Sequence, residues 1–262
     1  MERLMVIRLA SQGCTAEAWL NGLPMARVTP VAPHAVVPAH EAALAGTNRL
    51  ELLVETAVPA VPAPPKAPHS MAVRLQLLLP RVGSAIDESQ SRSLAELDWA
   101  CAAGEPLALP VQQVREADLP IRFPRWRWLD APVLQATPAL AGSAHAFITS
   151  LARDLARGQT DSFMSATRLR TEELALAYQR TPESESSRLR EWLEQMYAAA
   201  RLVWQPLAPA DLQLRPLAGG RLLECLGREG AAALTTVPDK TGSTLALPLK
   251  VSVVEGRFYV LR

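Results

Sequence analysis

The first half of the chain alternates short apolar runs with turn residues, a pattern typical of β-strands. Asn21 and Gly22 join two such runs and suit the two positive-φ positions of a type I′ turn, which predicts a hairpin. Residues 58–68 carry five prolines, so we expect an extended surface loop there. Strands are predicted over residues 4–10, 15–20, 23–28, 50–54, 71–79, 93–101 and 120–129. Short strands with frequent turns favour a β-sandwich.

The second half begins with apolar positions spaced three and four residues apart, which predicts amphipathic helices. The first stripe runs from residue 140 to 155 and Gly158 ends it. A second helix is expected over residues 160–179, with Thr160 or Asp161 as its N-cap, and Pro182 breaks it. A third stripe covers residues 189–200. The predicted buried sides are Phe163, Met164, Leu169, Leu174 and Tyr178, followed by Leu189, Trp192, Leu193, Met196, Tyr197 and Ala200.

The remainder of the chain reads as strands, over residues 212–214, 221–223, 231–237, 244–254 and 257–261. Ala218-Gly219-Gly220 and Glu255-Gly256 are the expected hairpin turns. Pro248 lies inside the longest run and indicates an edge or a bulge. Helices followed by an antiparallel meander predict an α+β half, with helices packed on a curved antiparallel sheet.

The distribution of proline separates the two halves, because 16 of the 22 prolines precede Ala139. A chain of 262 residues is long enough for two cores of ordinary size. We therefore predict two domains: an all-β sandwich over residues 1–132 and an α+β domain over residues 139–262. Residues 133–138 would link them.

Charge and cysteine content exclude several classes of protein. The first 138 residues carry 12 basic and 13 acidic side chains, and the remainder 15 and 13, so neither half has the basic excess of a nucleic-acid binder. Cys14, Cys101 and Cys225 are widely spaced, and we expect reduced, buried thiols. We find no membrane-spanning run and no secretory signal, which predicts a cytoplasmic protein, although a misassigned start codon would hide a leader.

Two sets of turn residues in the first half resemble galactose-binding-like jelly rolls. They are Ala18-Trp19-Leu20-Asn21-Gly22 and Gly46-Thr47-Asn48-Arg49-Leu50-Glu51-Leu52, and the match covers about residues 15–55. The resemblance implies a fold more than a ligand. In such domains sugar sites usually lie in rim loops, and here no rim loop carries a recognisable set of ligand residues.

The helix-then-strand order of the second half is similar to the nuclear-transport-factor-2-like and cystatin-like families, over about residues 140–262. The final segment, Val254-Glu255-Gly256-Arg257-Phe258-Tyr259-Val260, resembles the last hairpin of such domains. The resemblance implies a curved sheet that wraps a long helix and encloses a conical pocket. It also implies a homodimer formed through that sheet. The polar candidates for the pocket are Asp161, Tyr178, Tyr197 and Glu224. Each is also explained as a cap, a core aromatic or a solvated side chain.

Arg122, Trp126 and Trp128 would share one face of an extended segment. Such a face would form a stacking platform for a sugar ring or a base. The competing interpretation places both indoles in the core or in the seam between the two halves.

The sequence carries no dinucleotide, phosphate-loop, zinc-protease, nucleophile-elbow or EF-hand motif, and we predict no cofactor and no metal. The histidines are expected in turns or at the surface. A mixed-sign helix surface is predicted from Arg168, Arg170, Arg188, Arg190, Glu172, Glu173, Glu183 and Glu185.

These observations favour a noncatalytic two-domain protein that binds a protein partner or a small ligand, with neither nucleic acid nor membrane as its target. One alternative is an enzyme that acts on a small apolar substrate in the cone of the second domain. The other is a glycan-binding module that uses Trp126 and Trp128. For the ligand site we name Trp126, Trp128, Arg122, Tyr178, Tyr197 and Asp161.

Overall fold

The computed structural model describes residues 4–55, 66–80, 91–119, 121 and 123–262. By its internal contacts the chain divides into two compact units, Met1–Arg125 and Trp126–Arg262, which are described separately as the first and the second unit. The domain boundaries drawn from the sequence stay a prediction. Residues of the predicted linker do bond within the second unit, since Leu134 N donates to Gly220 O at 2.8 Å.

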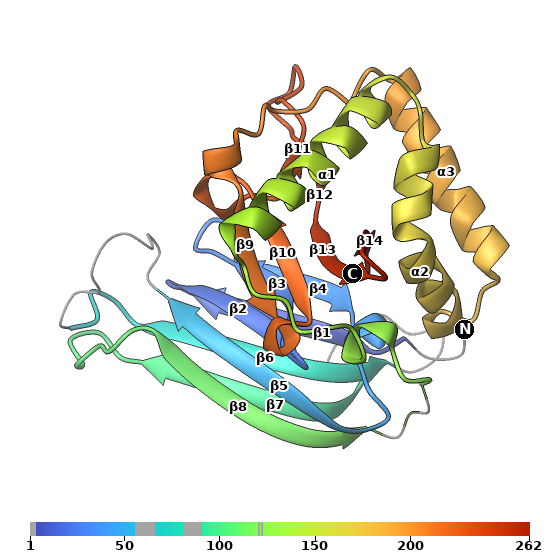
Figure 1. Cartoon of the computed structure of the whole chain (residues 1–262). Coiled ribbons are helices and arrows are strands. Elements are labelled where there is room, and N and C mark those ends of the chain that lie inside the picture. The colour runs from blue at the N-terminus through green and yellow to red at the C-terminus, as the bar shows by residue number, and fades with distance from the viewer. Residues whose placement is uncertain (1–3, 56–65, 81–90, 120, 122) are drawn as a thin grey trace. The chain divides into compact units, whose positions relative to one another are not determined.

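The described part of the first unit contains two four-stranded antiparallel sheets, ordered β4-β1-β6-β7 and β3-β2-β5-β8 (Figure 1). This arrangement is compatible with the predicted sandwich. The strands are β1 Val6–Gln12, β2 Thr15–Leu20, β3 Leu23–Val28, β4 His34–Pro38, β5 Gly46–Glu55, β6 Met71–Pro80, β7 Ser91–Cys101 and β8 Val111–Leu119, and a 3-10 helix, η1, covers His40–Ala42.

Alternation along the strands supplies the core of the first unit. In β6 the side chains of Val73, Leu75 and Leu77 are buried while Arg74 is exposed, as the period of two predicts. Gln76 shares the face of Arg74 but is also buried, and it donates to Glu96 Oε2 at 3.1 Å.

The predicted hairpin turn between β2 and β3 is confirmed, because Asn21 and Gly22 both have positive φ, at 54° and 77°. Asn21 Nδ2 also donates to Asn48 Oδ1 at 2.8 Å. Asn48 is buried, accepts from Leu44 N, and donates to the carbonyl oxygens of Leu44 and Gly46. These bonds fix the start of β5 against the hairpin, which explains why one asparagine stands in the turn and the other at the third position of β5.

Two strands of the first unit escaped the sequence analysis, and one predicted strand is wrong. β8 carries many polar residues, and β4 is only five residues long and ends at a proline, so neither presents a long apolar run; both strands lie at sheet edges. Residues 120–129 were predicted to be a strand, but Arg127–Leu129 forms the 3-10 helix η2. Residues 120 and 122 lie outside the described residues, as does most of the proline-rich segment 58–68.

The second unit places three helices before an antiparallel sheet of order β14-β13-β10-β9 and a two-stranded ladder, β11-β12 (Figure 1). The helices are α1 Pro138–Ala156, α2 Asp161–Ala177 and α3 Pro182–Ala198, with 3-10 helices η3 Pro209–Asp211, η4 Ala218–Gly220 and η5 Arg228–Gly230. The strands are β9 Gln213–Leu217, β10 Leu222–Leu226, β11 Leu234–Thr235, β12 Ala246–Leu247, β13 Leu249–Val254 and β14 Arg257–Val260.

Threonine caps and prolines at the first helical turn start two of these helices. Thr137 accepts from Leu140 N at 3.3 Å before Pro138, and Thr181 accepts from Ser184 N at 3.1 Å before Pro182. Proline suits this position because its missing N–H has no intrahelical partner to lose. Pro182 therefore begins α3 as well as following α2.

The core of the second unit joins α1 to the sheet. α1 buries Ala144, Ile148, Leu151 and Leu155 of its predicted stripe, while Leu140 and Phe147 are half-buried, and the sheet contributes the side chains that face it. The buried members are Ala144, Ile148, Leu151, Leu155, Phe163, Ala166, Leu193, Leu202, Leu212, Leu223, Cys225, Ala233, Leu234, Leu249, Val251 and Val260. The described part of the protein is thus a β-rich α+β structure.

The buried side of α2 differs from the prediction. Phe163 is buried as expected, but Met164, Leu169, Leu174 and Tyr178 are half-buried. Small and polar residues take the interior instead: Ala166, Thr167, Thr171, Glu173, Ala175 and Ala177. Thr167 and Thr171 satisfy their hydroxyls on the carbonyls of Phe163 and Thr167, so their burial leaves no donor unpaired.

Pro248 has a larger effect than an edge or a bulge. It divides the predicted strand 244–254 into β12, which pairs with β11, and β13, which pairs with β10 and β14. Proline has no N–H for a ladder, so the chain changes sheets there.

Neither α1 nor any other helix in the described ranges combines the length and apolar character that a membrane crossing requires.

Candidate functional site

The predicted stacking platform is contradicted by the burial of its two indoles. Trp126 is 0% exposed and Trp128 is 2% exposed, so neither ring offers a face to a sugar. The segment is also not extended, because Trp128 lies in η2. Arg122 lies outside the described residues. The interpretation that both indoles pack internally is the one that agrees with the structure.

The other predicted ligand residues do not converge. Asp161 begins α2, is exposed and pairs with Arg190 at 3.0 Å. Tyr178 follows the opposite end of the same helix, where the Arg180 guanidinium lies 5.9 Å from its ring centroid. Tyr197 is 47% exposed at the end of α3. No shared pocket brings these three side chains together among the described residues.

Tyr197 instead packs against the turn between α1 and α2. A Cβ atom at Gly158 would lie 2.7 Å from Tyr197 Cε1, and Gly158 has a φ of +74°. Both the contact and the backbone conformation require glycine. The position of Tyr197 is therefore explained by packing.

Glu224, the fourth polar candidate for the cone, lies in β10 and is held by two cross-strand cations. Arg215 Nη2 is 2.5 Å from its carboxylate and Lys250 Nζ is 3.9 Å away. The two cations compensate the negative charge of the carboxylate, which explains why Glu224 can be buried.

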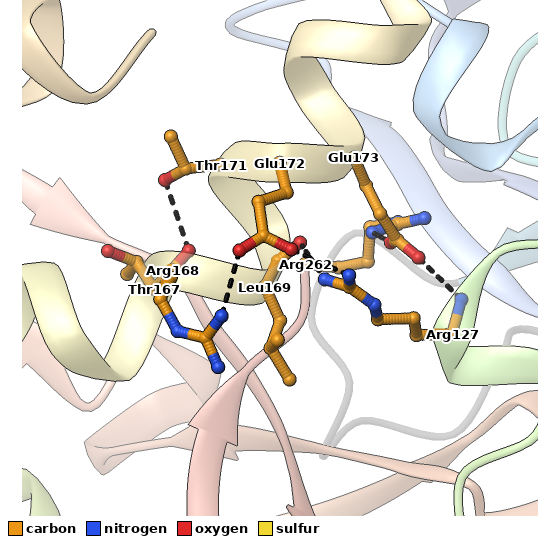
Figure 2. Close-up of polar contacts among 8 residues, drawn as sticks. All are labelled: Arg127, Thr167, Arg168, Leu169, Thr171, Glu172, Glu173 and Arg262. Atoms are coloured by element: carbon orange, nitrogen blue, oxygen red, sulfur yellow. Dashed lines mark hydrogen bonds and ion pairs between the residues drawn. The ribbon is translucent and has the colours of Figure 1, made fainter. Parts of the chain in front are cut away.

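A buried carboxylate that the sequence analysis misassigned lies on α2. Glu173 was predicted on a solvated helix surface, but it is 5% exposed. Its Oε1 accepts from Arg127 N at 2.5 Å and its Oε2 pairs with Arg262 Nη1 at 2.5 Å (Figure 2). The Arg262 guanidinium also lies 5.4 Å from the Trp126 ring centroid.

The neighbouring Glu172 points to the outer side of the same cluster. It pairs with Arg127 at 2.6 Å and with Arg168 at 2.9 Å (Figure 2). Arg127 Nη1 additionally donates to Leu169 O at 3.3 Å. Every carboxylate in this cluster is thus engaged by cations or backbone N–H groups, an arrangement that joins α2 to η2 and to the residues after β14. It stabilises the fold and leaves no acid or base for substrate.

The thiols are poor candidates for chemistry. All three cysteines are buried and unpaired. Burial raises the pKa of Cys14 to about 11. Burial, assisted by the negative charge of Glu224, raises the pKa of Cys225 to about 12. Both thiols therefore stay protonated near neutral pH, where a nucleophile must be a thiolate. Within the described ranges no group of three His, Cys, Asp or Glu side chains is placed to hold a metal ion.

A cavity of about 550 Å³ in the second unit is the strongest candidate for a ligand site. Its walls come from one face of α1, from residues 202–207 and from the start of β11. The apolar lining consists of Ile148, Ala152, Ala156, Leu202, Val203, Pro206, Leu207, Ala233 and Leu234, and the polar lining of Thr149, Arg153, Trp204 and Gln205.

The wall formed by residues 202–207 is held in place by backbone bonds. Gln205 N donates to Thr235 O and Val237 N donates to Val203 O, both at 2.8 Å. Trp204 and Thr236 thereby form an isolated antiparallel bridge directly after β11. At the other end His145 Nε2 donates to Leu207 O at 2.8 Å, since a carbonyl can only accept. The cavity is consequently formed before any ligand arrives.

Other hollows are less suitable. A space of about 620 Å³ beside residues 199–203 is lined by the 236–243 loop. Its Asp239 already accepts from the Thr241 hydroxyl, from Thr241 N and from Ser243 N, and these hydrogen bonds lower the pKa of Asp239. A groove of about 560 Å³ on the first unit is lined by charged residues of both signs, Arg74 and Asp98, which pair with each other at 3.5 Å.

Sequence reasoning missed the residues of the α1 cavity. The spacing of Ile148, Ala152 and Ala156 was available as a signal, because small side chains beside an apolar stripe leave space next to the helix. Residues 202–207 gave no periodic signal, and their approach to α1 depends on the tertiary fold. No protein-family model, curated protein or solved structure matches this chain.

Proposed function

We propose that this protein binds a small, mainly apolar molecule in the cavity between α1 and residues 202–207, without transforming it. The observation that carries the proposal is the cavity itself. Its volume of about 550 Å³ falls within the range of ligand pockets, roughly 300–1,000 Å³. Its lining is mostly aliphatic with a few polar groups, which is the usual composition of such pockets.

The chemistry of the lining supports binding over catalysis. The described residues around the cavity include no carboxylate, imidazole, thiol or phenol. General acid–base and nucleophilic catalysis draw mostly on those groups. His145 is engaged with the Leu207 carbonyl. An enzyme acting on an apolar substrate in the cone, with Asp161, Tyr178 or Tyr197 as its polar groups, is less well supported, because these side chains lie apart.

The proposal can be tested with N-phenyl-1-naphthylamine, a neutral apolar fluorophore, titrated into the full-length protein. We expect saturable binding at one site. The substitution Ala152→Phe would fill the cavity and should abolish this binding. The matched control is Ala146→Phe, at an exposed position of the same helix, which should bind as the unmodified protein does. Circular dichroism would establish that both variants fold.

Two results would overturn the proposal. One is the absence of saturable binding by the unmodified protein. The other is unchanged binding in folded Ala152→Phe, which would place the fluorophore elsewhere. A protein partner, a homodimer through the sheet of the second half and the two family resemblances stay predictions and carry no part of this argument.

A further inference from the structure

We propose that the ligand of the α1 cavity is an organic anion, whose acidic group binds Arg153 while its apolar body lies along Ile148, Ala152 and Ala156. This inference rests on the proposed function, because it names the class of ligand for the same cavity. It is carried by the way α1 arranges polar and apolar side chains along one wall.

Two parallel rows of α1 side chains line the cavity. Ile148, Ala152 and Ala156 are spaced four residues apart and form an apolar row. Thr149 and Arg153 are also four residues apart and form a polar row beside it. From residue 148 to 156 the helix rises about 12 Å, which sets the length of the apolar wall. A matching ligand is apolar along one side and polar at one point.

Arg153 is the charged member of this lining, and its charge is available. Within the described part of the chain neither Arg153 nor Thr149 has a side-chain hydrogen bond or an ion pair. Two arginines on the neighbouring helices are paired instead, Arg168 with Glu172 at 2.9 Å and Arg190 with Asp161 at 3.0 Å. The position of Arg153 in the last turn of α1 suits the helix dipole, but that does not require it to line a cavity.

A guanidinium beside an apolar wall selects the charge of its ligand. Its planar N–H groups bind carboxylate, sulfonate or phosphate oxygens in a two-bond arrangement. The Thr149 hydroxyl, one turn away, supplies a further donor. A cationic ligand would be repelled, and a neutral one would gain only the apolar contacts. The cavity therefore fits an acid with a compact apolar body.

The test uses two fluorophores with the same rings, 8-anilinonaphthalene-1-sulfonate and the neutral N-phenyl-1-naphthylamine. In the full-length protein, Arg153→Gln should weaken binding of the sulfonate about tenfold, as expected for the loss of one partly exposed charge-assisted contact. It should leave binding of the neutral compound unchanged. Arg153→Lys should retain part of the sulfonate affinity. The matched control is Arg257→Gln, at an exposed position of β14 outside the cavity.

The outcomes separate this inference from the proposed function. In one outcome the neutral compound binds and Ala152→Phe abolishes its binding, but Arg153→Gln does not weaken binding of the sulfonate. The proposed function then holds, and the inference that the ligand is an anion is wrong. If Arg257→Gln weakens the sulfonate as much as Arg153→Gln, the effect is one of overall charge, and the inference is overturned. If the neutral compound does not bind, the proposed function itself fails.

Discussion

Glu173 and Arg262 form a buried ion pair at 2.5 Å, although 89 residues separate them in the chain. Their side chains are 6% and 4% exposed. The pair fastens α2 to the residues after β14, and Arg127 N completes the coordination of the carboxylate. A buried charge is tolerated because its partner and its hydrogen bonds replace the lost hydration.

Glu173→Gln should reduce the free energy of unfolding by about 3–5 kcal/mol, because it removes the carboxylate charge that pairs with the buried Arg262 guanidinium. Urea denaturation followed by circular dichroism would measure the loss. The control is Glu172→Gln, which removes a more exposed carboxylate of the same helix and should cost less than about 1 kcal/mol. Equal losses in the two variants would contradict the structural role of the pair.

Trp126→Ala should destabilise the protein by about 3–5 kcal/mol, because it removes a large, fully buried side chain and leaves a cavity. Its thermal unfolding midpoint should fall accordingly. Asp161→Ala removes an exposed partner of Arg190 and should change stability by less than about 1 kcal/mol. A stable Trp126→Ala variant that had lost glycan binding would restore the stacking platform rejected above.

Asn48→Ala should reduce stability by about 2–4 kcal/mol, because the buried amide makes four hydrogen bonds that alanine cannot replace. Chemical denaturation of the full chain would give the value. Thr47→Ala is the neighbouring control, since its exposed hydroxyl makes one bond, to Asp118 Oδ1 at 2.6 Å. The prediction fails if the two substitutions cost the same.

Stability should fall as the pH rises above about 9, through the buried thiols. The pKa of Cys14 rises from 9.0 to about 11, and that of Cys225 from 9.0 to about 12. Below pH 9 both thiols are protonated in the folded and unfolded states, so the pH has no effect through them. Above pH 9 the thiols of the unfolded chain lose their protons first. The free energy of unfolding then falls by about 1.4 kcal/mol per pH unit and per thiol until the pH reaches the pKa of the folded state.

The measurement is urea denaturation between pH 8 and pH 10.5, compared with Cys225→Ala. The variant should show a smaller decrease over this range, because one of the two thiols is gone. A decrease of the same size in the variant would assign the effect to other groups.

Local features of the first half could be predicted because their causes are local. The turn at Asn21 and Gly22 follows from two residues that accept positive φ, and the strands that flank it have their predicted bounds. β8 could not be found in this way. Its polar sequence pairs with β5 over nine residues, and only that neighbouring strand makes it a strand.

The candidate site was less accessible to prediction. Asp161, Tyr178 and Tyr197 were selected as polar residues on helices, yet their helices place them at different points of the surface. Arg153, which now carries the proposed ligand contact, was not selected, because one arginine on an amphipathic helix has no distinctive pattern. Its significance depends on the neighbouring wall of residues 202–207.

The sequence by itself determined where α1 buries its stripe, where the hairpins turn and which half holds the helices, since periodicity and turn chemistry depend on neighbouring residues. The tertiary structure alone decided that Glu173 lies inside, that Trp126 and Trp128 are buried, and that a cavity opens beside Ala152. The reason is physical: burial, ion pairing and cavities depend on which distant segments meet. The local sequence around a charged or aromatic residue is the same whether the fold buries that residue or exposes it.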